Sequence, residues 1–211
     1  MVTIKCKPDF KPLFYEHQAW SENKIICGID EVGRSCLAGP VVAAAAILKP
    51  RAKHKYLKDS KELTKEQRQE AYIWLLKNSD FAVGIINHRI IDRVNIHHAT
   101  LYAMKRALFQ LIALNKKPDL VLVDHMALKL DNLDILIRHF SYGESLSSSI
   151  AAASIIAKVT RDNLMARLDS AFSGYSFSSN KGYGTKAHKE AINNSGLIIC
   201  HRNSFVSRLN N

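Results

Sequence analysis

The sequence predicts an α/β fold in which helices flank a mixed central sheet. Two observations support this class: short apolar runs typical of buried strands, and longer stretches whose apolar residues recur with helical spacing. Strands come first and then alternate with helices, which favours an α/β sandwich. The chain has 211 residues, enough for one well-buried domain, and no repeat, low-complexity tract or long linker divides it.

Five apolar runs are predicted to be strands, because each is short, rich in aliphatic residues and bounded by polar or turn-forming residues. In chain order they are residues 25–30, 40–48, 81–86, 120–124 and a weaker run at 135–139. The first and the fourth run both end in aspartate. These two strand ends are therefore the first places to look for functional groups.

Three stretches between the strands are predicted to be helices. Thr64 followed by Gln67 indicates a capping box that opens a helix to about Lys77. The second helix carries an apolar stripe at Leu101, Met104, Leu108 and Leu111. The third runs from about 149 to 168, and its many alanines would let it lie close against a sheet.

The charge balance is strongly basic. Lys and Arg number 30 against 19 Asp and Glu, which gives a formal net charge of +11 and a pI near 9.6. A domain this basic attracts polyanions, of which nucleic acid is the commonest, although general solubility in a lysine-rich proteome would give the same sign. The basic residues are dispersed along the chain, which suits a binding face assembled by folding.

Composition also indicates in which cellular compartment the protein is expected. No apolar run approaches the roughly 20 residues that cross a bilayer, and the first ten residues have no apolar core of a secretory signal. The four cysteines are far apart and form no CxxC pair, so reduced thiols in the cytoplasm are expected. They are Cys6, Cys27, Cys36 and Cys200.

Nine histidines raise the question of a zinc site. Adjacent His97 and His98 lack the usual spacing of structural zinc ligands, and no cysteine pair accompanies them. We therefore expect no zinc, and expect His97-His98 to open a helix instead. His139, His188 and His201 are the other histidines that look available.

Acidic residues form the most suggestive pattern. Asp30 and Glu31 end the first strand, and Asp124 ends the fourth. Neighbours in a strand point to opposite faces, so Asp30 and Glu31 can meet at one site only where the strand finishes or bends, and residues 32–35 supply such a bend. Asp162 flanks the packed face of the third helix, about 120° from its apolar stripe.

Carboxylates in a basic protein make sense as hard oxygen ligands for Mg²⁺ or Mn²⁺. Two such ions roughly 3.5–4 Å apart can activate water and stabilise the leaving oxygen in phosphodiester hydrolysis. Taken singly, an acid at a strand end is more often a helix cap or a solvated turn. The pattern by itself leaves both interpretations open.

Residues 28–44, GIDEVGRSCLAGPVVAA, closely resemble the signature of bacterial ribonuclease HII. Further matches follow in the family's order over nearly the whole chain. They are Asp59-Ser60-Lys61 with Leu63, Asn95-Ile96 with Ala99-Thr100, Pro118-Asp119 leading to Val123-Asp124, SIAAASIIAKVTRD at 149–162, KGYGT at 181–185, and His201-Arg202 with Ser204-Phe205. One short motif would be weak, whereas this ordered set is very specific.

The resemblance implies a ribonuclease H-like fold, one catalytic domain over residues 1–211, with about 170–211 as a helical C-terminal extension. It implies that four acids are catalytic and hold two Mn²⁺ or Mg²⁺ ions. These acids are Asp30, Glu31, Asp124 and Asp162.

The resemblance also implies how substrate is recognised. The main chain of Gly33-Arg34-Ser35 would contact the ribose 2′-hydroxyl, the group that distinguishes RNA from DNA. Tyr183, in the extension, would stack on the deoxyribose at the RNA–DNA junction. Lys61, Ser154 and Lys158 are further substrate-binding candidates, and the last two would orient acids or phosphates, with packing or capping as the alternative.

Three positions depart from the family's pattern, of which Glu144, where the family tends to have Asp, is the mildest change. Ser35 stands at the third position of the family's Gly-Arg-Gly turn; if that position needs a positive φ, serine costs about 1 kcal/mol and tilts the amides that read the 2′-hydroxyl. His125 follows the third acid where the family usually has glycine, and either crowds the metal site or turns into solvent. We expect weakened activity, above all at single embedded ribonucleotides.

The leading interpretation is an endoribonuclease that hydrolyses the RNA strand of RNA–DNA hybrids and cuts 5′ to ribonucleotides embedded in duplex DNA. Its expected partners are these nucleic acids, with no membrane, no zinc and a monomeric chain, and no glutamine–aliphatic–aromatic motif for a sliding clamp is found. Ribonuclease HIII is less favoured, because that family carries an extra N-terminal domain and about two dozen residues precede the signature here. The alternative from another class is a catalytically weak or silent duplex-binding protein of the same fold.

Overall fold

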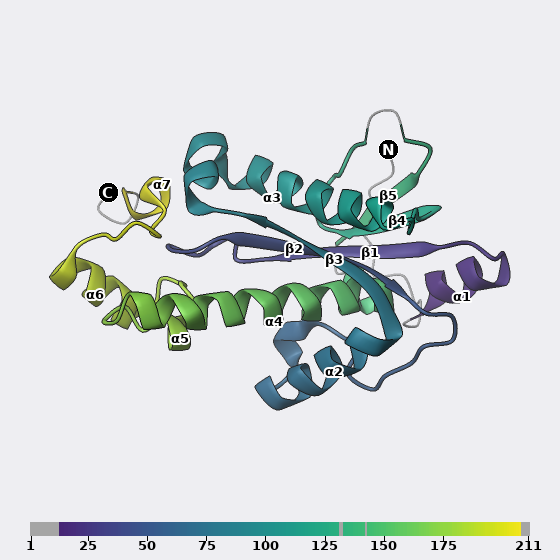
Figure 1. The fold of residues 1–211 in the computed structure, drawn as a ribbon, viewed down its shortest axis with the longest axis horizontal. Coiled ribbons are helices and arrows are strands. Elements are labelled where there is room, and N and C mark those ends of the chain that lie inside the picture. The colour runs from purple at the N-terminus through teal and green to yellow at the C-terminus, as the bar shows by residue number, and fades with distance from the viewer. Residues whose placement is uncertain (1–12, 131–132, 142, 208–211) are drawn as a thin grey trace.

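Five strands form one mixed sheet in the order β3-β2-β1-β4-β5 (Figure 1). They are β1 (Ile26–Val32), β2 (Val41–Leu48), β3 (Ser79–Ile86), β4 (Leu120–Asp124) and β5 (Leu136–Phe140). β1 to β3 are antiparallel neighbours, whereas β4 runs parallel to β1 and β5 parallel to β4. The structure, a computed structural model, describes residues 13–130, 133–141 and 143–207. The predicted mixed sheet and its five strands are confirmed.

Helices cover both faces of the sheet. α3 (His88–Ala113) packs on one face, and α4 (Ser148–Ala171) and α2 (Lys65–Asn78) lie on the other (Figure 1). The remaining helices are α1 (Phe14–Ser21), α5 (Phe177–Asn180), α6 (Lys186–Ser195) and α7 (Asn203–Val206), with 3-10 turns η1 (Ser60–Glu62) and η2 (Gly143–Ser145). The three long helices were predicted, and α5, α6 and α7 lie in the region expected to be a helical C-terminal extension; α1 was not predicted.

Local signals set the helix starts. Thr64 and Gln67 form both hydrogen bonds of the predicted capping box at α2. α3 begins earlier than its apolar stripe, at His88, and is interrupted at Asn95, which has a φ of 66°. The Asn95 side chain accepts a hydrogen bond from the His98 N–H at 3.1 Å. His97-His98 therefore opens the second part of α3, as expected.

Two glycines allow the long helices to lie against the sheet. A Cβ on Gly28 in β1 would overlap the main chain of Ser149 in α4, and one on Gly84 in β3 would overlap the carbonyl of Ala103 in α3. Buried alanines line β2 and the facing side of α4. Small side chains thus bring α4, and the acid it carries, close to β1.

The C-terminal region packs on the loop that follows β1. Leu37 and Ala38 of that loop share an apolar cluster with Met165 of α4 and with Phe177 and Ile192 of the C-terminal helices. Single β-bridges join Cys36 to Tyr183 and Ala38 to His201. The loop is therefore enclosed by chain segments that are more than 120 residues away in sequence.

Cys27, Cys36 and Cys200 are buried and form no disulfide, in agreement with the expected reduced thiols; Cys6 lies outside the described residues. Among the helices that the structure describes, none is both long enough and apolar enough to cross a membrane.

Candidate active site

Three of the four predicted acids lie on neighbouring strands. β1 continues to Val32, so Asp30 and Glu31 lie within the strand and pair with Ala44 and Ala43 of β2; the prediction that they end the strand was wrong. Since Ile29 pairs with Val123 in the parallel β1–β4 ladder, Asp124 follows beside Asp30. We call Asp30, Glu31 and Asp124 the acid cluster.

The acid cluster is electrostatically crowded. Burial, followed by the charges of Glu31 and Asp124, raises the pKa of Asp30 well above its usual range. Burial also raises the pKa of Glu31, and Arg34, whose Nη1 lies 3.2 Å from Glu31 Oε1, opposes that rise. Glu31 Oε2 is buried and has no hydrogen-bond partner among the described residues. The cluster therefore holds more negative charge than its surroundings neutralise.

Asp124 is held at both of its oxygens. The Gly143 N–H donates to Oδ1 at 2.8 Å, and a Cβ on Gly143 would lie only 2.6 Å from Ile150 Cδ1. His125 Nδ1 lies 2.9 Å from Oδ2. Of the two alternatives for His125, its ring thus contacts the acid, although half of the side chain is exposed. His125 also has a φ of 54°, a conformation that favours glycine and that explains the family's usual residue there.

Asp162 is paired with a lysine on its own helix. Lys158 Nζ lies 2.8 Å from Asp162 Oδ1, one turn earlier on α4. The same ammonium lies 5.7 Å from the centroid of the Tyr183 ring. Lys158 therefore touches both an acid and the predicted junction-reading residue. In the described part of the chain, no three His, Cys, Asp or Glu side chains converge as a preformed metal site.

Ser154 links the acid cluster to the Asp59-Ser60-Lys61 motif. Its hydroxyl bonds the Asp30 carboxylate, which opposes the raised pKa of that group, and lies 2.9 Å from the Ser60 hydroxyl. Ser154 and Ser60 are both buried. Lys61 is different: its side chain is 86% exposed, with Nζ 4.0 Å from Asp59 Oδ2. Ser154 orients an acid, whereas Lys61 extends into solvent.

The segment Gly33-Arg34-Ser35, which we call the GRS turn, needs its glycine at the first position. Gly33 has a φ of 90°, and a Cβ there would overlap the Arg161 guanidinium. Ser35 does not adopt a positive φ. The backbone strain that we expected at Ser35 is therefore absent, and the strain lies at His125 instead.

Two fully buried arginines hold the loop after β1, and sequence reasoning gave neither a role. Arg161 donates to the carbonyls of Ala38, Pro40 and Lys181 at 3.2, 2.9 and 2.8 Å, one bond from each nitrogen of its planar guanidinium. Arg202 donates to the carbonyls of Gly33, Arg34 and Gly39 at 2.7, 2.9 and 3.0 Å. The available signal was that each arginine lies inside a matched motif, directly beside Asp162 or His201.

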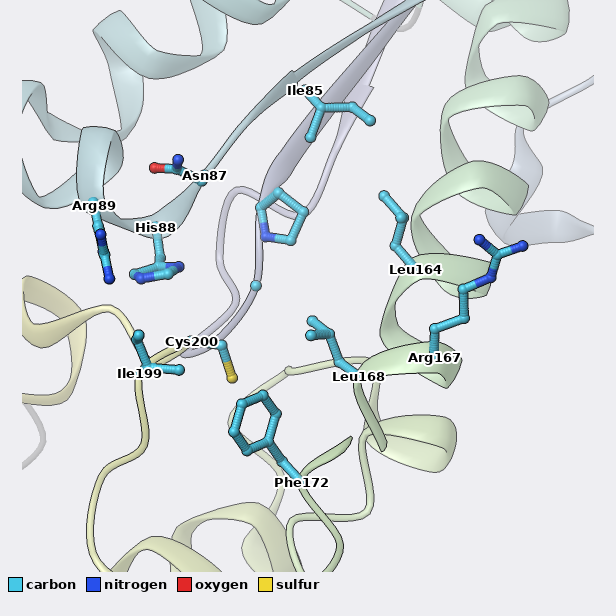
Figure 2. Close-up of a pocket in the computed structure, with 12 residues that line it drawn as sticks. Ile85, Asn87, His88, Arg89, Leu164, Arg167, Leu168, Phe172, Ile199 and Cys200 are labelled. Carbon is cyan, nitrogen blue, oxygen red and sulfur yellow. The ribbon is translucent and has the colours of Figure 1, made fainter. Parts of the chain in front are cut away.

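Two cavities flank this region. A polar cavity of about 330 Å³ lies beside Asp162 and is also lined by Lys65, Ser178 and Lys181. A larger cavity of about 530 Å³ lies between α4 and the start of α3, and Figure 2 shows Leu164, Phe172 and Ile199 around it. None of the residues that line the larger cavity in the described part of the chain is acidic. Of these two cavities, only the smaller one is therefore lined by a carboxylate, that of Asp162.

Comparison with known proteins decides the family. A family model described as Ribonuclease HII matches residues 27–208. A ribonuclease HII of Pelagibacter ubique (strain HTCC1062) is 45% identical over 182 residues, which is 86% of this chain and 96% of that protein. The chain belongs to the ribonuclease HII family. It is therefore a ribonuclease H, an endonuclease that hydrolyses the RNA strand of RNA–DNA hybrids.

Solved structures agree on the fold. The ribonuclease HII of Archaeoglobus fulgidus, solved in complex with PCNA, matches with a TM-score of 0.66 at 22% identity over 85% of this chain and 94% of that one. Bst-RNase HIII, solved in complex with Mn²⁺, gives a TM-score of 0.66 at 23% identity over 86% of this chain and 67% of that one. The predicted ribonuclease H-like fold is confirmed.

Proposed function

We propose that this ribonuclease HII cuts the phosphodiester on the 5′ side of a ribonucleotide, both in RNA–DNA hybrids and where a single ribonucleotide lies in duplex DNA. Asp30, Glu31, Asp124 and Asp162 are the catalytic acids. Water is the nucleophile, and the products are a 3′-hydroxyl and a 5′-phosphate. The chain works as a monomer in the cytoplasm, as one domain whose C-terminal extension carries Tyr183.

The observation that carries this proposal is the unneutralised charge of the acid cluster. Burial and the neighbouring charges of Glu31 and Asp124 raise the pKa of Asp30, burial and Asp124 raise the pKa of Glu31, and a buried oxygen of Glu31 has no partner in the described chain. Burying unpaired carboxylates costs free energy, and a bound cation lowers that cost by neutralising their charge. A site of this kind supports the binding of divalent cations.

The donor set fits Mg²⁺ or Mn²⁺, because all four side chains offer hard carboxylate oxygens. When bound, these ions supply the positive charge that activates water and stabilises the leaving oxygen in phosphodiester hydrolysis. Ser154 keeps Asp30 oriented, and the Gly143 N–H fixes one oxygen of Asp124. Lys158 restrains Asp162 until substrate or cation competes for it.

Recognition of the ribose falls to the GRS turn and to Tyr183. Main-chain N–H groups of the turn contact the 2′-hydroxyl, which DNA lacks. The Tyr183 ring packs against the neighbouring deoxyribose and excludes a sugar with an additional hydroxyl. Lys61, Lys158, Lys65 and Lys181 contact phosphates, which makes binding salt-dependent.

The experiment is cleavage of a labelled DNA duplex with one ribonucleotide, beside an RNA–DNA hybrid, with Mg²⁺, with Mn²⁺ and with chelator. Metal-dependent cutting 5′ to the ribonucleotide is expected, together with at least a hundredfold loss in Asp124→Asn. That variant keeps an oxygen for the Gly143 N–H and so serves as a matched control for folding and for contaminating nuclease.

The other outcomes are informative in different ways. Cutting of the hybrid alone would agree with the proposed catalytic role of the four acids. It would refute the proposed role of the GRS turn and Tyr183 at single ribonucleotides. Duplex binding without metal-dependent cutting would favour a catalytically silent binder. Affinity that does not change between low and moderate salt would refute the proposed phosphate contacts.

A further inference from the structure

Two histidines, fully buried in the C-terminal region, face each other behind Tyr183. His188 lies in the first turn of α6, and His201 precedes the buried Arg202. Their Nε2 atoms are 3.1 Å apart. The rings of Tyr175 and Phe177 pack around them, with centroid separations of 5.1–6.5 Å. The pair is therefore shielded from water.

The direction of hydrogen bonding along this pair follows from its two ends. The Ile198 N–H can only donate, and it points at His201 Nδ1 from 3.0 Å, so that nitrogen carries no proton. The Tyr183 carbonyl can only accept, and His188 Nδ1 lies 2.9 Å from it, so His188 Nδ1 carries a proton. Neutral rings then leave the His201 Nε2–H to donate to the bare His188 Nε2. One tautomer of each ring satisfies every group.

The residue after His201 anchors the other recognition element. Arg202 donates to the carbonyls of Gly33 and Arg34. All described peptide bonds are trans, and in a trans peptide the C=O and N–H point in opposite directions. The N–H groups of Arg34 and Ser35 are thus turned away from Arg202, and neither donates to another described residue. Arg202 fixes the turn with two N–H groups presented outward.

We infer that His188 and His201 are positioning residues that fix Tyr183 relative to the GRS turn. His201 acts on Tyr183 through His188, while its neighbour Arg202 holds the turn. The two recognition elements are thereby tied to one dipeptide. This inference rests on the proposed function, in which Tyr183 and the GRS turn read the sugars on the two sides of a junction.

The hydrogen bond between His188 and the main chain of Tyr183 distinguishes this role from simple core packing. His188 makes its Nδ1 contact with the main chain of Tyr183 itself, five residues earlier, and the same carbonyl accepts from the Thr185 N–H at 2.8 Å. On its other side, Tyr183 is bridged to Cys36, directly after the GRS turn. A change at the His188 Nδ1 position therefore shifts Tyr183 without unpacking the surrounding rings.

Two substitutions at His188 divide its two contacts. His188→Asn places an amide N–H where Nδ1 stands, so it keeps the bond to Tyr183 and loses the bond to His201. His188→Gln places an amide oxygen where Nε2 stands, so it keeps the bond to His201 and loses the one to Tyr183. The variants are matched in polarity and each loses one hydrogen bond.

The readout is the ratio of kcat/KM on the duplex with one ribonucleotide to kcat/KM on the uniform hybrid. We expect His188→Gln to lower this ratio about tenfold, the effect of one hydrogen bond, and His188→Asn to keep it within about twofold. Equal losses in both variants, or no loss in His188→Gln, would overturn the inference. A wild-type protein that cuts neither substrate would instead refute the proposed function.

A second measurement does not depend on activity or on the folding of a variant. Nitrogen-15 NMR of the wild-type histidines reports which ring nitrogen is protonated. We expect the proton on Nδ1 of His188 and on Nε2 of His201. The opposite tautomer of either ring, or a doubly protonated ring at neutral pH, would be incompatible with the hydrogen bonds that run from His201 through His188 to Tyr183. Either result would overturn the inference.

Discussion

The acid cluster and the GRS turn adjoin each other on the chain but are built in opposite ways. The acid cluster gathers like charges, leaves a buried oxygen of Glu31 without a partner in the described chain, and adjoins a strained residue at His125. The GRS turn is held by Arg202, whose three side-chain nitrogens each donate to a carbonyl, and Tyr183 beside it is contacted by a histidine pair with matched donors and acceptors. The difference indicates that one side awaits a charged ligand, whereas the other is complete before substrate arrives.

The largest effect on stability is expected when the hydrogen bonds that hold the GRS turn are removed. Arg202→Met removes the donors of two buried carbonyls and one partly buried carbonyl, and an unsatisfied buried group costs about 1–3 kcal/mol. The free energy of unfolding should fall by about 3 kcal/mol or more, measured by urea denaturation. Arg34→Met, whose side chain is 41% exposed in the wild type, should change it by less than about 1 kcal/mol. Equal effects would show that water replaces the lost donors.

The histidine pair should make the complete side sensitive to acid. Burial, then the neighbouring His188, lowers the pKa of His201 to about 4, and burial lowers that of His188; His88 is the other charged group that acts on His201. An unfolded histidine titrates near 6.5, so between pH 6.5 and 4 the unfolded chain binds more protons and stability falls as the pH falls. The loss is on the order of 3 kcal/mol at His201.

His201→Gln tests this pH dependence. The glutamine keeps a donor toward His188 but cannot be protonated, so the decline of unfolding free energy between pH 6.5 and 4 should be shallower than in the wild type. An identical decline in both proteins would assign it to other groups.

On the acid side, removing charge should stabilise the fold and abolish activity. Asp30→Asn keeps one oxygen as the acceptor for the Glu31 N–H, offers an N–H that the Ser154 hydroxyl can accept, and relieves repulsion with its neighbours. We expect about 1 kcal/mol of added stability, a Tm rise of about 2–4 °C, with at least a hundredfold loss of cleavage. Asp80→Asn, at an exposed ion pair with Lys116, is the control and should not raise Tm. A lower Tm for Asp30→Asn would contradict the crowding.

The smallest effect concerns His125. At a φ of 54°, glycine relieves about 0.5–1 kcal/mol of strain, which offsets the loss of the half-exposed contact between His125 and Asp124, so His125→Gly should stay within about 0.5 kcal/mol of the wild type. His125→Ala removes the same ring and keeps the strain, so it should be about 0.5–1 kcal/mol less stable than His125→Gly. Thermal unfolding of the two variants measures this; equal stability would remove the backbone argument.

The sheet and the long helices could be predicted because each depends on a local pattern. The apolar run before Asp124 and the Thr64–Gln67 capping box are read directly from neighbouring residues. The extension of β1 beyond Asp30 could not be predicted from a local pattern, because it depends on the pairing of Val32 with Val42 in β2. Likewise, no local pattern predicts α1, whose buried Glu16 meets Ser147 and Ser149 more than 130 residues later.

The candidate site was predictable for its acids and not for its supports. Carboxylates near strand ends marked Asp30 and Asp124 as candidate ligands, and the resemblance to the family separated them from helix caps and solvated turns. The parts played by Arg161, His188 and Arg202 depend on carbonyls far away in the sequence, and a sequence does not reveal which carbonyls need donors. The same limit explains why we placed strain at Ser35, while backbone geometry assigns it to His125.

The link between Arg202 and the GRS turn also sets an order of events during synthesis. The hydrogen bonds to Gly33 and Arg34 span 169 and 168 residues of chain. At about 5–20 residues per second, a ribosome that has made the turn needs roughly 8–34 s to make the arginine that fixes it. The nascent chain therefore carries Asp30 and Glu31 long before Arg202 can hold the GRS turn, and under the proposed function substrate selection would be the last property that it acquires.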